Sequence, residues 1–275
     1  MARNKKMKLG LIVGLHDNMV DEFKKIEDIG IPTCQVTGTA EDMVLRHKLD
    51  RVADAMAKTK IEVSSIFFVF EGQTYNNATG PKTDGLVPEK HRARRADLTI
   101  RAAKLVKQLG VVNVTSHVGF IPDDEASPLY LKFLKVMKTV AKELLANGQN
   151  YCFETGQELP STLKRAIDHV GTGNLFINLD PANLILYGKA NPLDAVAIFG
   201  PWVRGMHAKD GVWPNRGESL GQETRLGEGM VNFPLLLRRL KACGFTGPVT
   251  IEREISGPQQ VTDIKHAMKL LGPHL

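Results

Sequence analysis

The chain has 275 residues, of which 43% are hydrophobic and 24% are charged, and its formal net charge is +6. These values exclude a disordered chain, and no apolar run approaches the roughly 20 residues of a membrane span, so we expect no membrane partner. The basic runs at residues 3–8 and 91–95 lack interleaved aromatic residues, so we interpret them as solvated faces and expect no nucleic-acid partner. Three widely spaced cysteines within apolar runs predict reduced thiols and a cytoplasmic protein.

Short apolar or β-branched runs alternate with longer stretches of helical periodicity along the whole chain. Predicted strands cover residues 9–15, 33–37, 62–70, 111–117, 151–154, 175–180, 203–208 and 248–252. Predicted helices cover residues 21–28, 40–58, 88–109, 128–145, 160–170, 192–199, 233–243 and 259–271. Eight strand–helix units predict one α/β domain over residues 1–275, a single (β/α)₈ TIM barrel. A dinucleotide-binding sheet is disfavoured because no Gly-x-Gly-x-x-Gly follows the first strand.

Candidate ligands stand where four consecutive predicted strands end, which is where such barrels place their active sites. They are Glu154, Asp180, His207 and Glu252. Taken singly, each residue also fits a helix N-cap or a packed core position. Together, three carboxylates at one rim repel one another and need a proton or a cation. Oxygen ligands with one imidazole favour Mn²⁺, Mg²⁺ or Co²⁺ over structural zinc, so we predict one divalent metal ion, with Mn²⁺ preferred.

These residues lie in motifs that resemble the xylose-isomerase-like barrels of the sugar-phosphate isomerases and epimerases, including the ketose 3-epimerases. The matching segments are Phe153-Glu154-Thr155-Gly156, Asn178-Leu179-Asp180-Pro181-Ala182-Asn183-Leu184, His207-Ala208-Lys209-Asp210, Leu226-Gly227-Glu228-Gly229 and Ile251-Glu252-Arg253-Glu254. The resemblance implies that the four candidate ligands bind the metal, and that Glu154 and Glu252 also transfer the proton. It further implies substrate-binding roles for Glu158, one helical turn beyond Glu154, and for Arg225.

Two positions depart from the ketose 3-epimerase pattern. Asn183 stands where those enzymes usually carry a histidine, and an asparagine still donates to a sugar hydroxyl. Lys209 meets a phosphate or carboxylate of the substrate in one interpretation, and it pairs with Asp210 in the other. In the last predicted strand, Glu254 alternates with Glu252 and is expected to face outward toward the helices.

Other rim residues have two interpretations each. His16 and His117 end predicted strands, and each either lines the pocket or packs in the core. Glu71 opens a polar loop that we expect to close over substrate. Trp213 either stacks on a sugar face or anchors the loop at residues 210–229, which is long for a connection of this kind and is predicted to cover the active site.

The leading functional hypothesis is a metal-dependent isomerase or epimerase of a sugar or sugar phosphate, which transfers a proton through an enediolate that the metal stabilises. One alternative is a dehydratase of a keto-sugar or keto-cyclitol on the same barrel. A nuclease that resembles endonuclease IV is less favoured, because it needs three zinc ions and further histidines where Asn183 and Lys209 stand. The resemblance also suggests a homo-oligomer, either a dimer or a tetramer.

Overall fold

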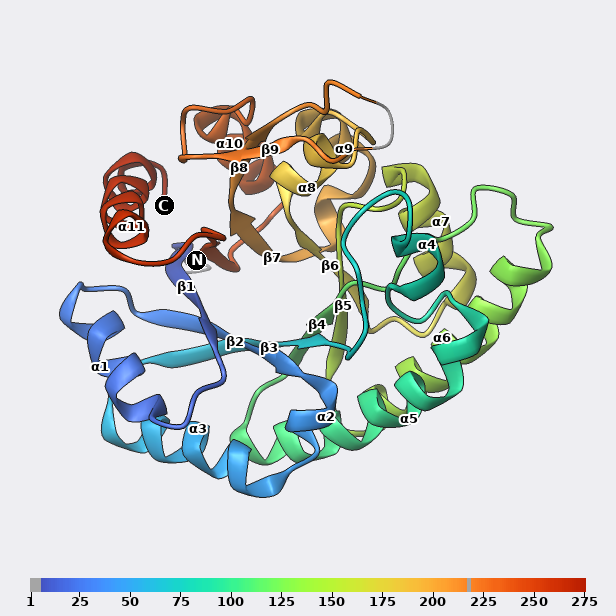
Figure 1. Cartoon of the computed structure of the whole chain (residues 1–275), viewed down its shortest axis with the longest axis horizontal. Helices are drawn as coiled ribbons and strands as arrows, with labels where there is room; N and C mark the ends of the chain where they lie inside the picture. Colours follow the sequence, from blue (N-terminus) through green and yellow to red (C-terminus); the bar gives the residue numbers. More distant parts are fainter. Residues whose placement is uncertain (1–5, 217–218) are drawn as a thin grey trace.

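The computed structural model describes residues 6–216 and 219–275, and within them eight parallel strands close into a barrel. In barrel order each strand pairs with the next one in the chain, and the last pairs with the first, which confirms the predicted fold (Figure 1). The barrel strands are β1 (Lys8–Gly14), β2 (Thr33–Thr39), β3 (Glu62–Val69), β4 (Asn113–Ser116), β5 (Asn150–Glu154), β6 (Leu175–Leu179), β7 (Val203–Ala208) and β10 (Pro248–Ile251).

Helices surround the barrel, and their order follows the predicted alternation with the strands (Figure 1). The outer helices are α1 (Met19–Asp28), α2 (Ala40–Met43), α3 (Arg46–Lys58), α5 (Glu89–Val106), α6 (Pro128–Ala146), α7 (Pro160–Val170), α9 (Pro192–Phe199), α10 (Phe233–Ala242) and α11 (Pro258–Leu271). Short helices α4 (Gly80–Thr83) and α8 (Pro181–Leu186) lie in loops after strands. Among the described helices, none combines the length and apolarity that a membrane crossing requires.

Two segments differ from the predicted elements. The helix predicted over residues 40–58 is broken, because Leu45 has extended backbone angles (φ −93°, ψ 103°) and α3 starts only after it. The loop predicted at residues 210–229 contains an antiparallel hairpin of β8 (Asp210–Val212) and β9 (Gln222–Thr224). The break at Leu45 and the three-residue strands of the hairpin are too short to show a period in the sequence.

Helix α1 illustrates how the sequence produces the outer layer. The Asn18 side chain accepts the N–H of Asp21 and caps the helix, and Met19, Phe23 and Ile26 lie on one buried face. Burial of a large apolar side chain stabilises the fold by about 1.5–3 kcal/mol. This spacing therefore fixes which face of the helix packs on the barrel.

The barrel interior is narrow below the rim. Gly10 of β1 pairs with Thr33 on one side and Thr250 on the other. A Cβ atom at Gly10 would lie 2.8 Å from Thr33 Oγ1 and 2.9 Å from Thr250 Oγ1, so no larger residue fits there without movement of its neighbours. The strands are therefore closely packed at this level, and the cavity that adjoins the candidate ligands lies toward their carboxyl ends, where barrels of this kind place their active sites.

The basic run at residues 91–95 is a solvated face only in part, which corrects our interpretation of the sequence: Arg94 is exposed, but the other two arginines are buried. Arg92 and Arg95 of α5 are 5% and 1% exposed. Arg95 donates to the backbone carbonyls of Thr83 at 2.6 Å, Gly85 at 2.8 Å and Glu71 at 3.2 Å. The guanidinium group therefore supplies hydrogen bonds that the irregular loop at residues 71–87 cannot form within itself.

Replacement of Arg95 by methionine is expected to lower the free energy of unfolding by about 3 kcal/mol, since it leaves buried carbonyl groups without donors. The matched control is Arg94→Met on the same helix, whose guanidinium side chain is 59% exposed and pairs with Glu41. That change should cost no more than about 0.5 kcal/mol. Urea denaturation of both variants provides the measurement, and equal losses would contradict the role given to Arg95.

Candidate metal centre and active site

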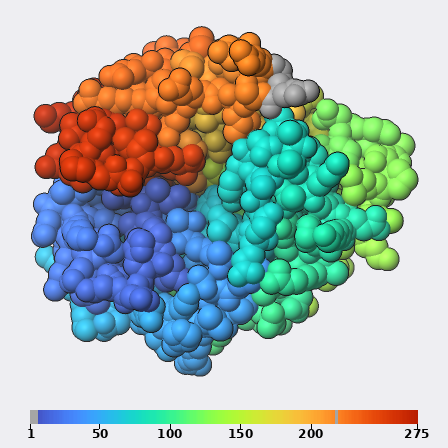
Figure 2. Space-filling view, viewed as in Figure 1, coloured from blue at the N-terminus to red at the C-terminus, as the bar shows by residue number. Residues whose placement is uncertain are grey.

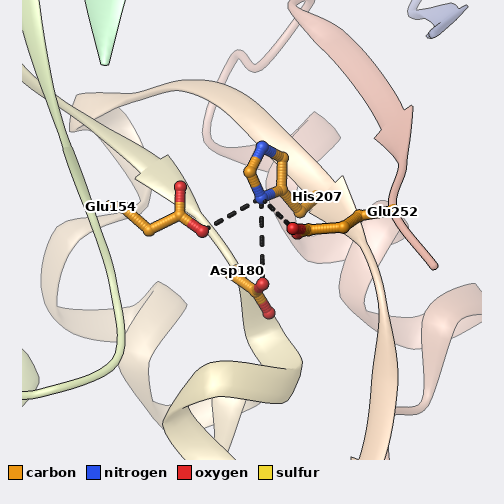
Figure 3. A group of neighbouring side chains, drawn as sticks. All are labelled: Glu154, Asp180, His207 and Glu252. Atoms are coloured by element: carbon orange, nitrogen blue, oxygen red, sulfur yellow. Dashed lines mark ion pairs between the residues drawn. The ribbon is translucent and has the colours of Figure 1, made fainter. Parts of the chain in front are cut away.

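Four side chains from neighbouring strands converge at the carboxyl end of the barrel. Glu154 ends β5 and His207 lies in β7, while Asp180 and Glu252 directly follow β6 and β10. We call these residues the ligand quartet; one potential ligand atom of each lies within 4.8 Å of the others. His207 Nδ1 is 3.0 Å from Glu154 Oε1, 2.8 Å from Glu252 Oε2 and 3.8 Å from Asp180 Oδ2 (Figure 3). The structure thus brings together all four candidate ligands.

Three buried atoms of the quartet form no hydrogen bond with the described residues: His207 Nδ1, Asp180 Oδ2 and Glu252 Oε2. The other polar atoms of two of these side chains are engaged. His207 Nε2 donates to Gln35 Oε1 at 2.6 Å, and Asp180 Oδ1 accepts the N–H of Asn183 at 2.8 Å. These bonds aim the free atoms at one point, and a divalent cation there would satisfy all three, so the residues present fit a metal ion.

Glu154 is held by two asparagines. Asn178, its register partner in β6, donates to Glu154 Oε2 at 2.9 Å, and Asn183 donates to Oε1 at 3.4 Å. Thr155 exchanges hydrogen bonds with the backbone of Asp180, 2.8 Å each way, and ties the ends of β5 and β6 together. Sequence reasoning gave no role to Gln35, Asn178 or Thr155. For Asn178 a signal existed, because it lies two residues before Asp180 and so faces the same side of the strand.

The two glutamates of the quartet differ in their affinity for a proton. Burial raises the pKa of Glu154 to about 7. Burial alone would also raise the pKa of Glu252, but the nearby charges of Lys209 and His207 outweigh it and lower that pKa. For His207, burial alone would lower the pKa, but Glu154 and Glu252 raise it well above its usual value. One glutamate thus binds a proton readily near neutral pH while the other stays ionised.

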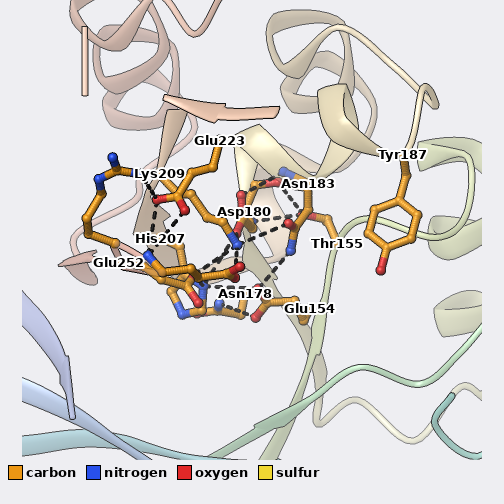
Figure 4. A network of polar contacts seen from close by, with 12 residues as sticks. Glu154, Thr155, Asn178, Asp180, Asn183, Tyr187, His207, Lys209, Glu223 and Glu252 are labelled. Atoms are coloured by element: carbon orange, nitrogen blue, oxygen red, sulfur yellow. Dashed lines mark hydrogen bonds and ion pairs between the residues drawn. The ribbon is translucent and has the colours of Figure 1, made fainter. Parts of the chain in front are cut away.

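Lys209 lies beside the quartet and is 3% exposed. Its ammonium nitrogen is 3.6 Å from Asp180 Oδ2 and 3.8 Å from Glu252 Oε2, and it donates to Asn183 Oδ1 at 3.3 Å (Figure 4). It also forms an ion pair and hydrogen bond with Glu254. The pairing of Lys209 with Asp210 that the sequence left open is therefore not observed.

The outward orientation predicted for Glu254 is wrong. Strand β10 ends at Ile251, so the alternation of strand side chains does not extend to residue 254. Glu254 instead lines the same cavity as Glu252 and reaches Lys209. Its side chain is 59% exposed, which places it at the mouth of the cavity and not among the helices.

A cavity of about 210 Å³ adjoins the quartet and is lined by Glu154 and Glu252 among others. Much of its wall is apolar or aromatic, from the side chains of Ile12, Phe67, Val69, Tyr75, Leu186, Tyr187 and Leu220. Tyr75 comes from the loop at residues 71–87 and Leu220 from the loop between β8 and β9. In Figure 2 the teal surface, which includes the first loop, faces the orange surface, which includes the β8–β9 segment, across the middle of the molecule. Both long loops thus contribute to the wall.

His117, which directly follows β4, also lines this cavity. Its Nδ1 atom is 2.9 Å from Gln157 Nε2, and Gln157 Nε2 also donates to Asp84 Oδ2 at 2.8 Å. Burial lowers the pKa of His117 to about 3, so the ring is neutral at physiological pH. The carboxylate of Asp84 orients the amide and, through it, the imidazole ring.

The other predicted substrate contacts divide into two groups. Asn183, Lys209 and His117 line the cavity with the quartet. Glu158 does not line it; it is buried, its carboxylate forms no hydrogen bond with the described residues, and burial raises its pKa well above the usual value.

The structure places the remaining candidates away from the cavity. Arg225 is 3.4 Å from Asp263 and 3.5 Å from Glu228. Glu71 pairs with Arg94, at 3.8 Å. The other two are also outside the cavity wall: His16 lines a separate crevice beside α1 and α11, and Trp213 is 37% exposed on the hairpin.

The base of the β8–β9 hairpin is clamped by one buried carboxylate. Asp210 accepts four backbone N–H groups, from Gly211, Gly227, Gly229 and Val231, at 2.8–3.1 Å. A Cβ atom at Gly229 would lie 2.2 Å from Asp210 Oδ1, so this close approach requires glycine. The clamp fixes both ends of the segment that carries Leu220 to the cavity.

Comparison with known proteins places this geometry among related barrels. A xylose isomerase domain protein from Planctomyces limnophilus superposes with a TM-score of 0.91 and 33% identity, covering 98% of this chain and 97% of that one. The 3-keto-D-glucoside 4-epimerase YcjR from E. coli gives 0.70 and 16% identity over 98% and 100%. The probable 3-DHS dehydratase AsbF from Bacillus anthracis gives 0.68 and 17% identity over 97% and 99%. Among curated proteins, no sequence matches this chain.

The sequence profile of the xylose isomerase-like TIM barrel matches residues 23–274, which is nearly the whole chain. The solved structures that resemble it include sugar epimerases and the probable 3-DHS dehydratase. Fold, ligand quartet and sequence profile lead to one conclusion: the chain belongs to the xylose isomerase-like TIM barrel family.

Proposed function

We propose that this protein is a divalent-metal-dependent isomerase or epimerase that moves a proton next to the carbonyl group of a sugar. The observation that carries the proposal is the convergence of Glu154 and Glu252 on one point from different strands, at a cavity with polar and aromatic walls. A quartet of three carboxylates and one imidazole suits Mn²⁺, with Mg²⁺ or Co²⁺ as alternatives. Sugars match the wall because hydroxyl groups pair with its polar side chains and ring faces pack on its aromatic ones.

The bound cation would act as a Lewis acid on the carbonyl oxygen and stabilise the negative charge that develops there. The protein groups move the proton. Glu154 and Glu252 lie on either side of the quartet, and one of them accepts the proton from the carbon while the other returns a proton to it (Figure 3). Lys209 and Asn183 donate hydrogen bonds to substrate oxygens, and the walls formed by Tyr75 and Leu220 exclude water from the reacting carbon.

A dehydratase is the second candidate, supported by the fold shared with the probable 3-DHS dehydratase and by the same requirement for proton abstraction next to a ketone. The two reactions differ only after that abstraction. An isomerase or epimerase returns a proton to carbon, whereas a dehydratase expels a β-hydroxide as water. The neutral His117 is not an acid for a leaving hydroxide, whereas Lys209 on the same wall is cationic, so the product of the reaction decides between the two candidates.

The test is a screen of ketoses, ketose phosphates and cyclitol ketones with the Mn²⁺-loaded protein in D₂O, followed by NMR. We expect at least one compound to gain deuterium at the carbon next to its carbonyl group and to convert to an isomer of equal composition. A product that lacks one water relative to its substrate would establish the dehydratase. Absence of exchange from every compound, with metal occupancy verified, would contradict both candidates.

A further inference from the structure

We propose that Glu254 determines charge specificity: by engaging Lys209 at the mouth of the cavity, it makes the site select neutral sugars over their phosphorylated forms. The inference deepens the proposed function and rests on it for the identity of the site. It assigns a role to a residue that neither binds the quartet's metal nor transfers a proton. It also decides between a sugar and a sugar phosphate as substrate.

The wall of the cavity carries little positive charge. Among the described residues that line the cavity, Lys209 is the one lysine or arginine. Phosphate groups are usually bound by several cationic or backbone donors, because a dianion must recover the hydration that it loses. The nearby start of α8 does not provide such donors, since Asp180 already caps it and Pro181 has no N–H group.

The positive charge of Lys209 is already balanced by neighbouring carboxylates. Three carboxylates surround its ammonium group: Asp180 at 3.6 Å, Glu252 at 3.8 Å, and Glu254 in a direct hydrogen bond. Asp180 and Glu252 also serve the metal site, so their charge is shared. Glu254 has no metal role, and it holds the ammonium from the solvent side, where the charged group of a phosphorylated sugar would enter.

Glu254 is held in position by contacts of its backbone. Its backbone N–H donates to the carboxylate of Glu223 at 3.2 Å, and Glu223 pairs with Arg253 at 2.9 Å. Arg253 in turn donates to Asp263 of α11 at 2.9 Å. This chain of contacts fixes the backbone at residue 254, so its carboxylate remains at the mouth. An incoming anion therefore meets a carboxylate before it reaches the lysine.

The experiment compares D-fructose with D-fructose 6-phosphate as probes, using calorimetric binding to the Mn²⁺-loaded wild type and two variants. Glu254→Gln removes the charge and nearly keeps the shape, and it should strengthen binding of the phosphate about tenfold while changing binding of the neutral sugar less than about threefold. The gain should shrink as salt is raised toward 1 M, where the screening length is about 3 Å.

The matched control is Glu228→Gln. Glu228 is also 59% exposed and pairs with Arg225, but it does not line the cavity. It should leave the ratio of the two affinities at the wild-type value. A wild type that binds the phosphate more tightly than the neutral sugar would overturn the inference, as would equal responses of the two variants.

Binding and turnover separate this inference from the proposed function. If neither probe nor any screened sugar exchanges its proton, but the affinity ratio still changes only in Glu254→Gln, the proposed reaction is wrong and the role of Glu254 stands. If neutral sugars exchange and the ratio does not change in that variant, the reaction stands and the role of Glu254 is wrong.

Discussion

Replacement of either Glu154 or Glu252 by glutamine is expected to lower turnover on the order of 10²-fold or more, the usual contribution of a positioned acid or base. Glutamine nearly preserves the shape of each side chain and can still offer an oxygen to a metal, but it cannot accept the proton. The two glutamates lie 3.0 Å and 2.8 Å from the same imidazole nitrogen and come from β5 and the end of β10, so under the proposed mechanism each would act on a different side of the sugar.

Three measurements make this result decisive. Metal content must be determined for each variant, since lost activity with lost metal says nothing about proton transfer. Deuterium uptake at the carbon next to the carbonyl group should persist in a metal-loaded variant that retains the abstracting base. Glu228→Gln is the control for loss of a glutamate charge, because Glu228 pairs with Arg225 and does not line the cavity. Normal exchange and turnover in both quartet variants would rule out the two-glutamate mechanism.

His207→Ala is expected to weaken Mn²⁺ binding by more than the roughly 10–100-fold that accompanies loss of an outer partner of a metal ligand. The reason is that Nδ1 of His207 is the common neighbour of all three carboxylates. Gln35→Leu provides the graded comparison. It keeps the ligand but removes the acceptor for Nε2, so its loss should fall within that 10–100-fold range.

Isothermal titration of metal-free protein measures both affinities, and circular dichroism confirms that each variant remains folded. Gln35→Glu retains an acceptor for the imidazole N–H and should bind Mn²⁺ more tightly than Gln35→Leu. Unchanged metal affinity in His207→Ala would show that the quartet does not hold the ion. Equal Mn²⁺ affinities of Gln35→Leu and Gln35→Glu would contradict the proposal that Gln35 orients the imidazole ring.

The barrel and its ligand quartet could be predicted because both depend on local, repeating features. Strand periodicity identifies the eight strands, and closure of a parallel sheet places all their carboxyl ends on one rim. Glu154, Asp180, His207 and Glu252 therefore had to approach one another once the fold was known. His117 follows from its place at a strand end, whereas Asn183 and Lys209 were identified through the resemblance to the ketose 3-epimerases.

Features that depend on irregular backbone could not be predicted in this way. The predicted orientation of the Glu254 side chain was wrong because β10 ends three residues earlier, so the alternation of side chains along a strand does not extend to it. The hydrogen bonds of Arg95 reach carbonyls 10 to 24 residues away along a loop without periodicity. Arg225 was assigned from a resemblance in its neighbouring residues, whereas its actual partner, Asp263, lies on α11 far along the chain.

The Asp210 clamp has a consequence for how such a protein can be redesigned. Its carboxylate binds backbone N–H groups, which every residue except proline supplies, so the clamp places almost no demand on side-chain identity. Space restricts the glycines of this segment instead. A Cβ atom at Gly229 would collide with the carboxylate, one at Gly221 would lie 1.9 Å from the carbonyl oxygen of Val212, and Gly227 has a φ of +88°. With these glycines retained, the other residues between β8 and β9 can be exchanged to reshape the wall at Leu220, while the ligand quartet on the barrel strands stays in place.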